Sequence, residues 1–372
     1  MVLYINGNYP YHSLHSELVS KLADMGNEIV VFVPLKENAI GGKYSYVHPN
    51  VEVIYAECLD LFDKFFFTHK AHKLANIIEE KIDLEKITCI LAGTLYSDGV
   101  VAFFLHKKHN IPFSVAVRET DVTYHMKWRP YLNLMIKKLL SKADKVIFLS
   151  PGYKTYLEKF ECDIKKIIVI PNAVNDFWFQ GDQEPRTLHN PISLVYVGEI
   201  SRRKNVRTTI SVIAEMNNRN IKTEFHVIGE GHEEIRCHSL VKKLNLEKQV
   251  FFYGWQNGKE EIKKYYDKSD IFIMPSIRET FGTVYVEALS QGLPLIYTKG
   301  QGIDGYFEDG IVGYACDPKS TIEMADKIIN IINDYRTISR NCIIKSNFFK
   351  WTLVAEEYNK VICGMEKRNE FS

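Results

Sequence analysis

The chain has 372 residues, more than one hydrophobic core usually covers, so we expect two domains. Apolar residues make up 46% of the sequence and charged residues 25%, the composition of an ordinary globular protein. The formal net charge of +1 argues against a nucleic-acid binder that relies on its overall charge. The longest apolar runs are only as long as strands, and the sequence starts directly with one. We therefore expect neither a membrane-spanning helix nor a secretory signal.

The cysteines indicate the compartment. There are seven, an odd number, scattered along the chain and without a C-x-x-C pair. This pattern is typical of free thiols in a reducing cytoplasm rather than of a disulfide framework. We therefore expect a cytoplasmic protein.

The first half of the sequence alternates short apolar runs with amphipathic stretches. The runs are continuously apolar, which is typical of parallel strands covered on both faces. Residues 13–25 carry Leu14, Leu18 and Leu22 on one face and end before Gly26, which predicts a helix. The predicted strands are 2–5, 28–33, 51–56, 88–93, 113–118, 145–150 and 166–171. The alternation predicts an α/β domain with a doubly wound, Rossmann-like sheet.

The pattern then restarts after a polar stretch. Residues 180–191 have the composition of a linker. The strands predicted beyond it are 193–198, 224–229, 250–255, 270–275, 293–298 and 312–317. We expect an N-terminal domain over 1–172, a second Rossmann-like domain over 173–350, and a last helix, about 351–372, that packs back on the first domain. Two such domains facing across a cleft bind a ligand at the carboxyl ends of their strands.

The segment most suggestive of function lies in the second half. A loop with Glu279 follows a predicted strand, and a helix is expected to begin near Phe281 and Gly282. The first amides of such a helix, those of Phe281, Gly282 and Thr283, can bind a phosphate without a metal ion. Glu287, further along the helix, can accept protons from a ribose diol, while Glu279 faces the far end of a diphosphate. The alternative is an ordinary helix start with favourable acids.

A basic loop follows the predicted strand 193–198. It holds Arg202, Arg203 and Lys204, which suit a diphosphate and the charge it develops as a leaving group. Taken alone, these side chains could be a solvated basic loop. Both loops leave strand ends of the same predicted sheet, so we expect them to meet.

With these motifs, the chain resembles the retaining GT-B glycosyltransferases of family four (glycosyl transferases group 1) over nearly its whole length. Glu279 and Glu287 match the E-x(7)-E motif of that family. The resemblance implies that Glu279 contacts the donor sugar, that Glu287 contacts the ribose, and that the amides of 281–283 hold the diphosphate. It also implies a GT-B fold and a nucleoside-diphosphate sugar as the donor.

The family's G-R-x(4)-K loop is only partly present. Its lysine falls on Lys204, but its arginine is replaced by Glu199, and Arg203 is the substitute that the resemblance suggests. Glu279, Lys204 and Arg203 are therefore the expected catalytic residues.

Smaller matches extend the expected site. Gly229 lies in a V-I-G-E-G segment similar to the family's G-x-G loop, and Gly254 lies at the strand end that contacts the base in the family. In the first domain, Gly7 is the only glycine in a loop that is glycine-rich in many members. The resemblance assigns these three glycines to donor binding.

The acceptor side departs from the family. The segment V-R-E-T-D at 117–121 stands where many members have V-H-G-x-D, so Arg118 replaces a histidine and Asp121 keeps its place. We expect Arg118 to supply charge or to orient Asp121. His12, in the first loop, is the third residue expected on this side.

No motif indicates a metal or a cofactor. The sequence lacks D-x-D, H-E-x-x-H and a G-x-x-x-x-G-K-[ST] loop. The histidine pairs His12/His15 and His69/His72 have no matching ligands, so we expect surface or capping histidines and no metal site.

A basic, aromatic stretch covers 124–145. It interleaves tyrosine and tryptophan with lysine and arginine and holds one acid, Asp144. Such a segment can rest on an anionic membrane surface, and the apolar residues 62–67 offer a second contact. The alternative is a core-facing helix with a solvated lysine face.

The sequence thus predicts a retaining, metal-independent hexosyltransferase. It would use a nucleotide-sugar donor and a glycan or lipid-linked acceptor, in bacterial surface polysaccharide synthesis. It would work in the cytoplasm, peripheral to the inner membrane face, without nucleic acid. Two alternatives stay open: a GT-B-like sugar-nucleotide epimerase, and a protein that binds the donor without transferring it.

Overall fold

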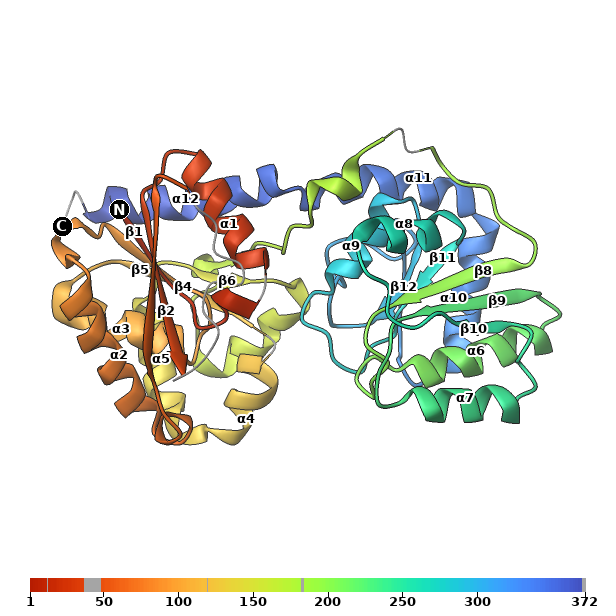
Figure 1. Ribbon diagram of the computed structural model, residues 1–372, viewed down its shortest axis with the longest axis horizontal. Helices are drawn as coiled ribbons and strands as arrows, with labels where there is room; N and C mark the ends of the chain where they lie inside the picture. The colour runs from red at the N-terminus through yellow and green to blue at the C-terminus, as the bar shows by residue number, and fades with distance from the viewer. Residues whose placement is uncertain (12, 37–47, 119, 182–183, 370–372) are drawn as a thin grey trace. The chain divides into compact units, whose positions relative to one another are not determined.

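The chain forms two compact units. A computed structural model describes residues 1–11, 13–36, 48–118, 120–181 and 184–369. Unit 1 comprises the described residues within Met1–Leu149, Tyr153–Ala173 and Trp351–Ser372, and unit 2 those within Ser150–Gly152 and Val174–Lys350 (Figure 1). The end of the chain thus belongs to unit 1, although it follows unit 2 in sequence.

Unit 1 is built on a parallel sheet. Within the described residues the sheet has seven strands in the order β3-β2-β1-β4-β5-β6-β7. The order reverses between β1 and β4, the switch point at which open α/β sheets bind ligands. The strands are β1 (Val2–Ile5), β2 (Ile29–Lys36), β3 (Val51–Leu59), β4 (Cys89–Ala92), β5 (Phe113–Val117), β6 (Val146–Phe148) and β7 (Ile167–Val169).

Helices cover both faces of this sheet. Val2 and Tyr4 of β1 point into one core, which contains α1 and α12, while Leu3 and Ile5 point into the other, which contains α2, α3 and α5. Because both faces are buried, the strands are continuously apolar. The helices are α1 (Ser13–Asp24), α2 (Phe67–Lys81), α3 (Asp98–His109), α4 (Met126–Trp128), α5 (Asn133–Lys142) and α12 (Trp351–Asn369).

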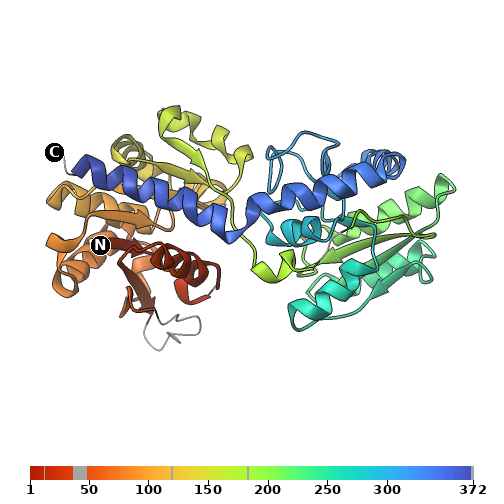
Figure 2. The same ribbon diagram turned by 90° about the horizontal axis from the view of Figure 1, so that it is seen from above.

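Helix α12 lies along α1 (Figure 2). The indole nitrogen of Trp351 donates to Glu17 at 2.6 Å, and the amide of Asn27 donates to Asn359 at 2.9 Å. These contacts tie the end of the chain to unit 1.

Unit 2 has the same α/β architecture as unit 1. Its described part contains a parallel sheet of six strands in the order β10-β9-β8-β11-β12-β13, which reverses between β8 and β11. The strands are β8 (Ile192–Val197), β9 (Thr223–Ile228), β10 (Val250–Phe252), β11 (Ile271–Ile273), β12 (Leu295–Thr298) and β13 (Gly313–Cys316). The predicted fold class, α/β with two doubly wound sheets, is confirmed.

Two groups of helices pack on this second sheet. Helices α6, α7 and α10 lie together on one face, and α9 packs against α11 on the other, where α8 contacts β8. The helices are α6 (Val206–Asn218), α7 (Glu234–Lys243), α8 (Lys259–Asp267), α9 (Thr283–Ser290), α10 (Thr321–Asn333) and α11 (Tyr335–Ser346). Shorter 3-10 helices are η1 (Tyr9–Tyr11), η2 (Phe62–Lys64), η3 (Leu84–Lys86), η6 (Pro151–Phe160), η7 (Ile164–Lys166), η8 (Asp176–Phe179) and η9 (Asn347–Phe349).

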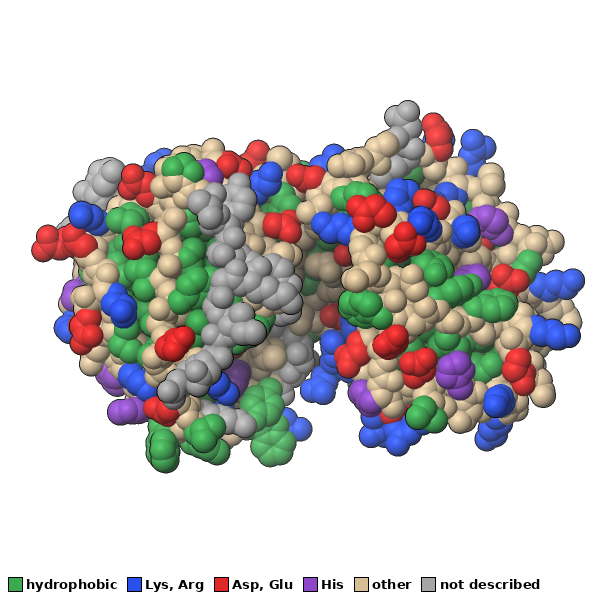
Figure 3. All heavy atoms as spheres, in the orientation of Figure 1, with side chains coloured by type: hydrophobic (Ala, Val, Ile, Leu, Met, Phe, Trp, Pro, Cys, Tyr) green, Lys and Arg blue, Asp and Glu red, His purple; other side chains and the backbone are tan. Residues whose placement is uncertain are grey.

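The basic, aromatic stretch at 124–145 is not one helix. A π-helical turn, η4 (Asp121–His125), is followed by α4, by the 3-10 turn η5 (Pro130–Leu132) and by α5. Pro130 explains the break, because it disfavours helical geometry at Arg129, whose φ is −129° and ψ 52°. Only part of the segment faces the core, and apolar side chains gather at the lower edge of unit 1 (Figure 3).

None of the helices within the described residues is both long and apolar enough to span a bilayer.

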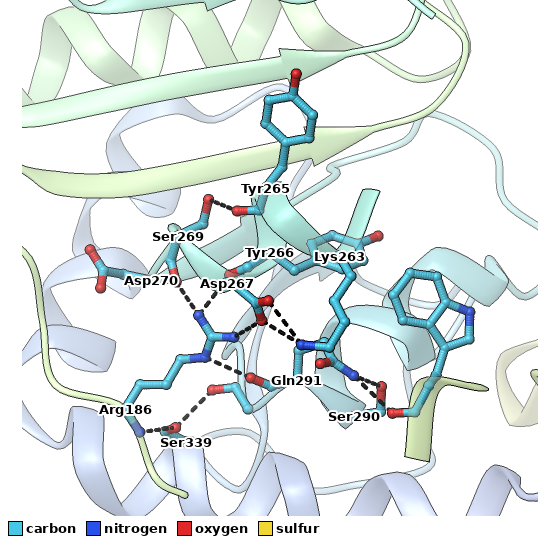
Figure 4. Close-up of polar contacts among 12 residues, drawn as sticks. Arg186, Lys263, Tyr265, Tyr266, Asp267, Ser269, Asp270, Ser290, Gln291 and Ser339 are labelled. Carbon is cyan, nitrogen blue, oxygen red and sulfur yellow. Dashed lines mark hydrogen bonds and ion pairs between the residues drawn. The ribbon is translucent and has the colours of Figure 1, made fainter. Parts of the chain in front are cut away.

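Arg186 anchors the polar segment before β8 to unit 2 (Figure 4). Its guanidinium donates to the carbonyls of Tyr266 (2.6 Å), Ser269 (3.1 Å) and Gln291 (2.7 Å), and it pairs with Asp267 at 3.2 Å. Two of these carbonyls, at Tyr266 and Gln291, lie at the ends of α8 and α9, where helix carbonyls need partners from outside the helix; that of Tyr266 also accepts from the Ser269 amide at 3.1 Å. The segment predicted to be a linker therefore contains a side chain, Arg186, that forms hydrogen bonds with the ends of two helices.

Candidate active site

The predicted acid and the predicted cations of unit 2 lie together. Strands β8 and β11 are neighbours in the sheet, so the loops that follow them leave the same edge. The Lys204 ammonium lies 2.5 Å from one carboxylate oxygen of Glu279, and a guanidinium nitrogen of Arg203 lies 3.8 Å from the other. The Lys204 and Glu279 side chains are 12% and 8% exposed, so the ion pair is largely buried. This places a cation and an acid at the switch point of the second sheet.

The Glu279 loop is fixed by its neighbours. Gln301, in the loop after β12, accepts a hydrogen bond from the Glu279 amide at 2.9 Å and donates to the Ile277 carbonyl at 3.0 Å. The Ile277 amide in turn donates to the Arg203 carbonyl at 2.7 Å. The two loops therefore form one hydrogen-bonded unit. Sequence reasoning missed Gln301, because its role depends on β12 lying beside β11.

Gly282 opens helix α9 and must be a glycine. Its φ is 77°, in the left-handed region, and a Cβ there would lie 2.7 Å from the Tyr285 ring and 3.3 Å from Cγ of Glu279. No side chain caps the helix, so its first amides can receive an anion. The helix starts at Thr283, slightly later than predicted, and the Phe281 ring is buried against Phe349. Phe281 can therefore contact a ligand only through its backbone.

Glu287 lies one turn inside α9, half-buried. Removal from solvent raises the pKa of its carboxyl to about 7, against a smaller opposing effect of Lys259. Within the described residues, no hydrogen bond of its side chain joins it to Glu279. A carboxylate that titrates near neutrality is well suited to a ligand that supplies hydroxyl donors.

Gly229 and Gly254 hold two strand ends together. The Gly229 amide donates to the Gly254 carbonyl at 2.9 Å, and the two residues form an isolated bridge. A Cβ on Gly229 would lie 1.9 Å from the Gly198 carbonyl oxygen, so this position packs directly against the start of the basic loop. Both glycines therefore have a role in the packing of the strand ends that does not depend on a ligand.

In unit 1, Asp121 is engaged by the backbone. Its buried carboxylate accepts from the amides of Leu95 and Tyr96 at 3.1 Å and of Arg118 at 2.8 Å. Burial raises the pKa of Asp121, while these amides act in the opposite direction. The Arg118 guanidinium donates to the Gly93 carbonyl at 3.0 Å, so Asp121 is hydrogen-bonded by the Arg118 backbone amide, while the charge of the guanidinium also lowers the pKa of Asp121. Asp121 thus joins the loops after β4 and β5.

Sequence reasoning missed Asp98 at the start of α3. Its buried carboxylate accepts from the Thr94 hydroxyl at 3.0 Å and from the backbone of Gly7. Burial raises the pKa of Asp98 to about 6, although Lys70 lowers it. A buried acid therefore lies against Gly7, the residue expected to approach the donor. The other residue predicted in this first loop, His12, lies outside the described residues.

No metal centre emerges from the part of the chain that the structure describes, since it holds no group of three or more His, Cys, Asp or Glu side chains arranged around one ion. His15 is buried and lies 3.1 Å from the Tyr4 hydroxyl, and the His72 ring stacks on Phe104. His15 therefore differs from the surface or capping position expected for it, because it is part of a buried polar cluster, whereas His72 is exposed, as predicted.

Two doubly wound units, with a buried Lys204–Glu279 pair at the switch point of the second, define a GT-B glycosyltransferase. The chain belongs to glycosyltransferase family 4: the model described as "Glycosyltransferase Family 4" matches residues 16–176, and the model "Glycosyl transferases group 1" matches residues 180–347. The predictions of this family and of an enzyme are thereby confirmed.

Curated relatives and solved structures agree with this assignment. The chain is 23% identical to N-acetyl-alpha-D-glucosaminyl L-malate synthase of Bacillus anthracis, over 86% of this chain and 83% of the relative. It is 23% identical to the gpi3 subunit of phosphatidylinositol N-acetylglucosaminyltransferase of Schizosaccharomyces pombe, over 93% and 75%.

Among solved structures, the lipopolysaccharide outer core galactosyltransferase WaaB matches with a TM-score of 0.77 at 15% identity, over 98% of this chain and 99% of that chain. Anabaena HepE in complex with UDP-glucose matches with a TM-score of 0.69 at 17% identity, over 98% and 99%.

Proposed function

We propose that the protein transfers a hexosyl unit from a nucleoside-diphosphate sugar to a glycan or lipid-linked acceptor, with retention of the anomeric configuration. The observation that carries this proposal is the buried Lys204–Glu279 pair beside the glycine-opened start of α9. The UDP-glucose in the similar structure of HepE supports a nucleotide sugar as the donor.

Each donor-side residue has a proposed task. Lys204, Arg203 and the first amides of α9 would bind the diphosphate and stabilise the negative charge that grows on it as the glycosidic bond breaks. Glu279 would accept hydrogen bonds from sugar hydroxyls, and Glu287 from the ribose diol. These groups supply the positive charge that a leaving diphosphate needs, so the proposed reaction requires no metal ion.

The acceptor would be bound by unit 1. Asp98 and Arg118 are charged groups beyond the carboxyl ends of β4 and β5. The similar proteins named above act on a phosphatidylinositol and on lipopolysaccharide, by their names. A lipid-linked acceptor or a growing surface polysaccharide fits this setting, at the cytoplasmic face of a membrane.

Unit 1 also has a surface suited to that membrane. Two groups of large apolar side chains are between 50% and 78% exposed: Leu61, Phe62, Phe65 and Phe66, and Tyr124, Trp128, Tyr131 and Leu134. The two groups adjoin, because the Phe67 ring lies 3.9 Å from the Arg129 guanidinium and 5.4 Å from the His125 ring. Figure 3 shows apolar side chains at this edge of the unit, with basic side chains near them.

The charges around this surface favour an anionic bilayer. Asp60 and Asp63 are both paired with Lys73, at 2.8 and 3.1 Å, so their negative charge is offset. Lys138 and Lys142 of α5 add positive charge. We therefore propose that exposed aromatic side chains enter the headgroup region while lysines contact anionic lipids.

Vesicle sedimentation tests this contact. Wild-type protein should bind vesicles that contain phosphatidylglycerol and should bind pure phosphatidylcholine vesicles weakly. The double substitution Phe65→Ser/Trp128→Ser should abolish binding, and neutralising Lys137, Lys138 and Lys142 should weaken it. Unchanged sedimentation of both variants would refute the membrane contact without affecting the proposed reaction.

The reaction itself is tested by ligand panels and product analysis. A thermal-shift panel of UDP-, GDP- and ADP-sugars should reveal one donor that raises the melting temperature, because a ligand that binds only the folded state stabilises it. Mass balance then separates the alternatives, since an epimerase converts the donor without an acceptor. If Glu279→Gln bound the donor and transferred sugar at the wild-type rate, the assignment of Glu279 would be wrong. Donor binding without turnover by any acceptor would favour the donor-binding protein.

A further inference from the structure

A polar pocket lies in unit 2, on the face that carries α6, α7 and α10. Its volume is about 440 Å³. Of the described residues that line it, Arg202 alone belongs to the basic loop predicted to suit a diphosphate, and Arg203, Lys204 and the start of α9 are not in the lining. Its polar lining includes Ser201, Arg202, Arg207, Glu233, Lys319 and Thr321.

The pocket is positively charged. Arg202 comes from the loop after β8, Arg207 from the first turn of α6, and Lys319 from the loop before α10, so three separate segments contribute cations. The one acid in its lining as described is Glu233, whose side chain is 4% exposed. Its carboxylate is hydrogen-bonded to Arg236 and lies 3.9 Å from Arg207, so its charge is already offset. The net positive charge of the lining therefore favours the binding of an anion.

The start of α6 adds to this charge, whereas the start of α10 is capped by Ser320, whose hydroxyl accepts from the Glu323 amide at 3.2 Å. Helix α6 begins at Val206 and α10 at Thr321, and both residues line the pocket. Asn205, the residue before α6, does not cap it: its side-chain nitrogen donates to the carbonyls of Pro275 (3.0 Å) and Pro318 (2.7 Å), and its side-chain oxygen accepts from the Thr208 hydroxyl at 2.7 Å. The positive end of α6 therefore has no side-chain acceptor, which is the arrangement that binds phosphate oxygens.

Ser201 supplies an independent sign of a ligand. The residue is 6% exposed and lines the pocket, and within the described residues its hydroxyl has no hydrogen-bond partner. A buried hydroxyl without a partner costs stability, and an oxygen acceptor from a ligand would remove that cost.

We propose that this pocket binds the phosphate group of a small phosphorylated molecule, separately from the donor site. The pocket shares a wall with that site, since Arg202 adjoins Arg203 and the lining residue Ile277 donates its amide to the Arg203 carbonyl at 2.7 Å. A phosphate held there restrains the loop that carries Arg203 and Lys204. Its binding lowers the KM for the donor, which makes the pocket an effector site. Phosphate binding itself does not depend on the proposed transfer reaction.

Phosphate titrations of four proteins test the site. Inorganic phosphate is titrated, by phosphorus NMR or calorimetry, into wild type, Arg202→Gln/Lys319→Gln, Lys204→Gln and the control Lys242→Gln, which changes an exposed lysine at the far end of α7. Loss of two charge-assisted contacts should weaken binding by at least about tenfold in the double variant. Lys242→Gln should bind as wild type does. Lys204→Gln should keep the pocket's phosphate, because it alters only the donor site.

The opposite pattern overturns the proposal. If the double variant binds phosphate as tightly as wild type does, or if wild type binds none at millimolar phosphate, the pocket is not a phosphate site. A hexose phosphate titrated in parallel identifies the source of the phosphate: tighter binding than inorganic phosphate indicates a phosphorylated sugar, and equal binding indicates phosphate itself. Arg202 and Lys319 are exposed, so equal melting temperatures should show that the variant is folded.

Discussion

Replacing Lys204 by methionine should weaken both the stability of unit 2 and the transfer reaction. The ammonium lies 2.5 Å from Glu279, with 12% of the lysine side chain exposed. Removing one partner of a buried ion pair costs about 3–5 kcal/mol. Because Arg203 remains 3.8 Å from the second carboxylate oxygen and some solvent reaches the pair, we expect a loss of about 2–3 kcal/mol.

A double-mutant cycle isolates this interaction. In Lys204→Met/Glu279→Gln neither ion of the pair remains, so the double variant should be more stable than the sum of the two single losses predicts, by about 1–2 kcal/mol. Urea denaturation at neutral pH, followed by circular dichroism and tryptophan fluorescence, measures the four free energies of unfolding. Strictly additive losses, or a Lys204→Met variant within about 0.5 kcal/mol of wild type, would refute the reasoning.

The same variant separates stability from chemistry. If Lys204 stabilises the leaving diphosphate, kcat should fall by about 10²–10³ at temperatures where the variant is fully folded. A fall in stability with an unchanged kcat would show that the pair only holds the loop in place.

Further predictions concern three other residues of unit 2. Donor affinity should fall as the pH drops below about 7, roughly tenfold per pH unit, because protonation of Glu287 removes an acceptor for the ribose diol. In titrations from pH 5.5 to 8.5, Glu287→Gln should flatten this dependence. Arg186→Met should destabilise unit 2 by about 2–4 kcal/mol in urea denaturation with an unchanged donor Kd, because it removes the guanidinium that donates to the carbonyls of Tyr266, Ser269 and Gln291. An effect below about 0.5 kcal/mol would contradict the anchoring role. Gly282→Ala should cost about 1–3 kcal/mol in stability, since the alanine is strained at this φ and its Cβ meets the Tyr285 ring. It should also weaken donor binding in a thermal-shift titration. A donor-induced shift equal to that of wild type would exclude the helix start as the diphosphate site.

The positions of the strands along the chain could be predicted from the sequence because each is an apolar run between polar loops. Where each strand ends was less readable. The predicted strand 250–255 pairs only over Val250–Phe252, because the Gly254 carbonyl turns to accept from Gly229 instead. Likewise, the predicted strand 270–275 ends at Ile273, where the chain begins the loop that leads to Glu279. Apolar composition continues past the point at which parallel pairing stops.

The meeting of Glu279 with Arg203 and Lys204 was predictable because these residues stand on two loops with local signals: a glycine before a helix, and adjacent cations after a strand. The residues that sequence reasoning missed act across the sheet. Gln301 reaches Glu279 from the next strand's loop, and Asp98 reaches Gly7 from β4 to β1. Neither residue has a signal in the local sequence, because each becomes a neighbour of its partner only when the strands pair in the sheet.

The basic loop after β8 connects these findings. Its Lys204 faces Glu279, while Arg202 faces a pocket on the helical side of the same unit. The loop backbone is bonded to the Glu279 loop through Ile277, which lines that pocket as well. A short segment with charges directed to two sides can therefore transmit a change at one site to the other without any movement of the sheet. For this reason the loop is both the place where the donor diphosphate would bind and the place where its binding would be regulated.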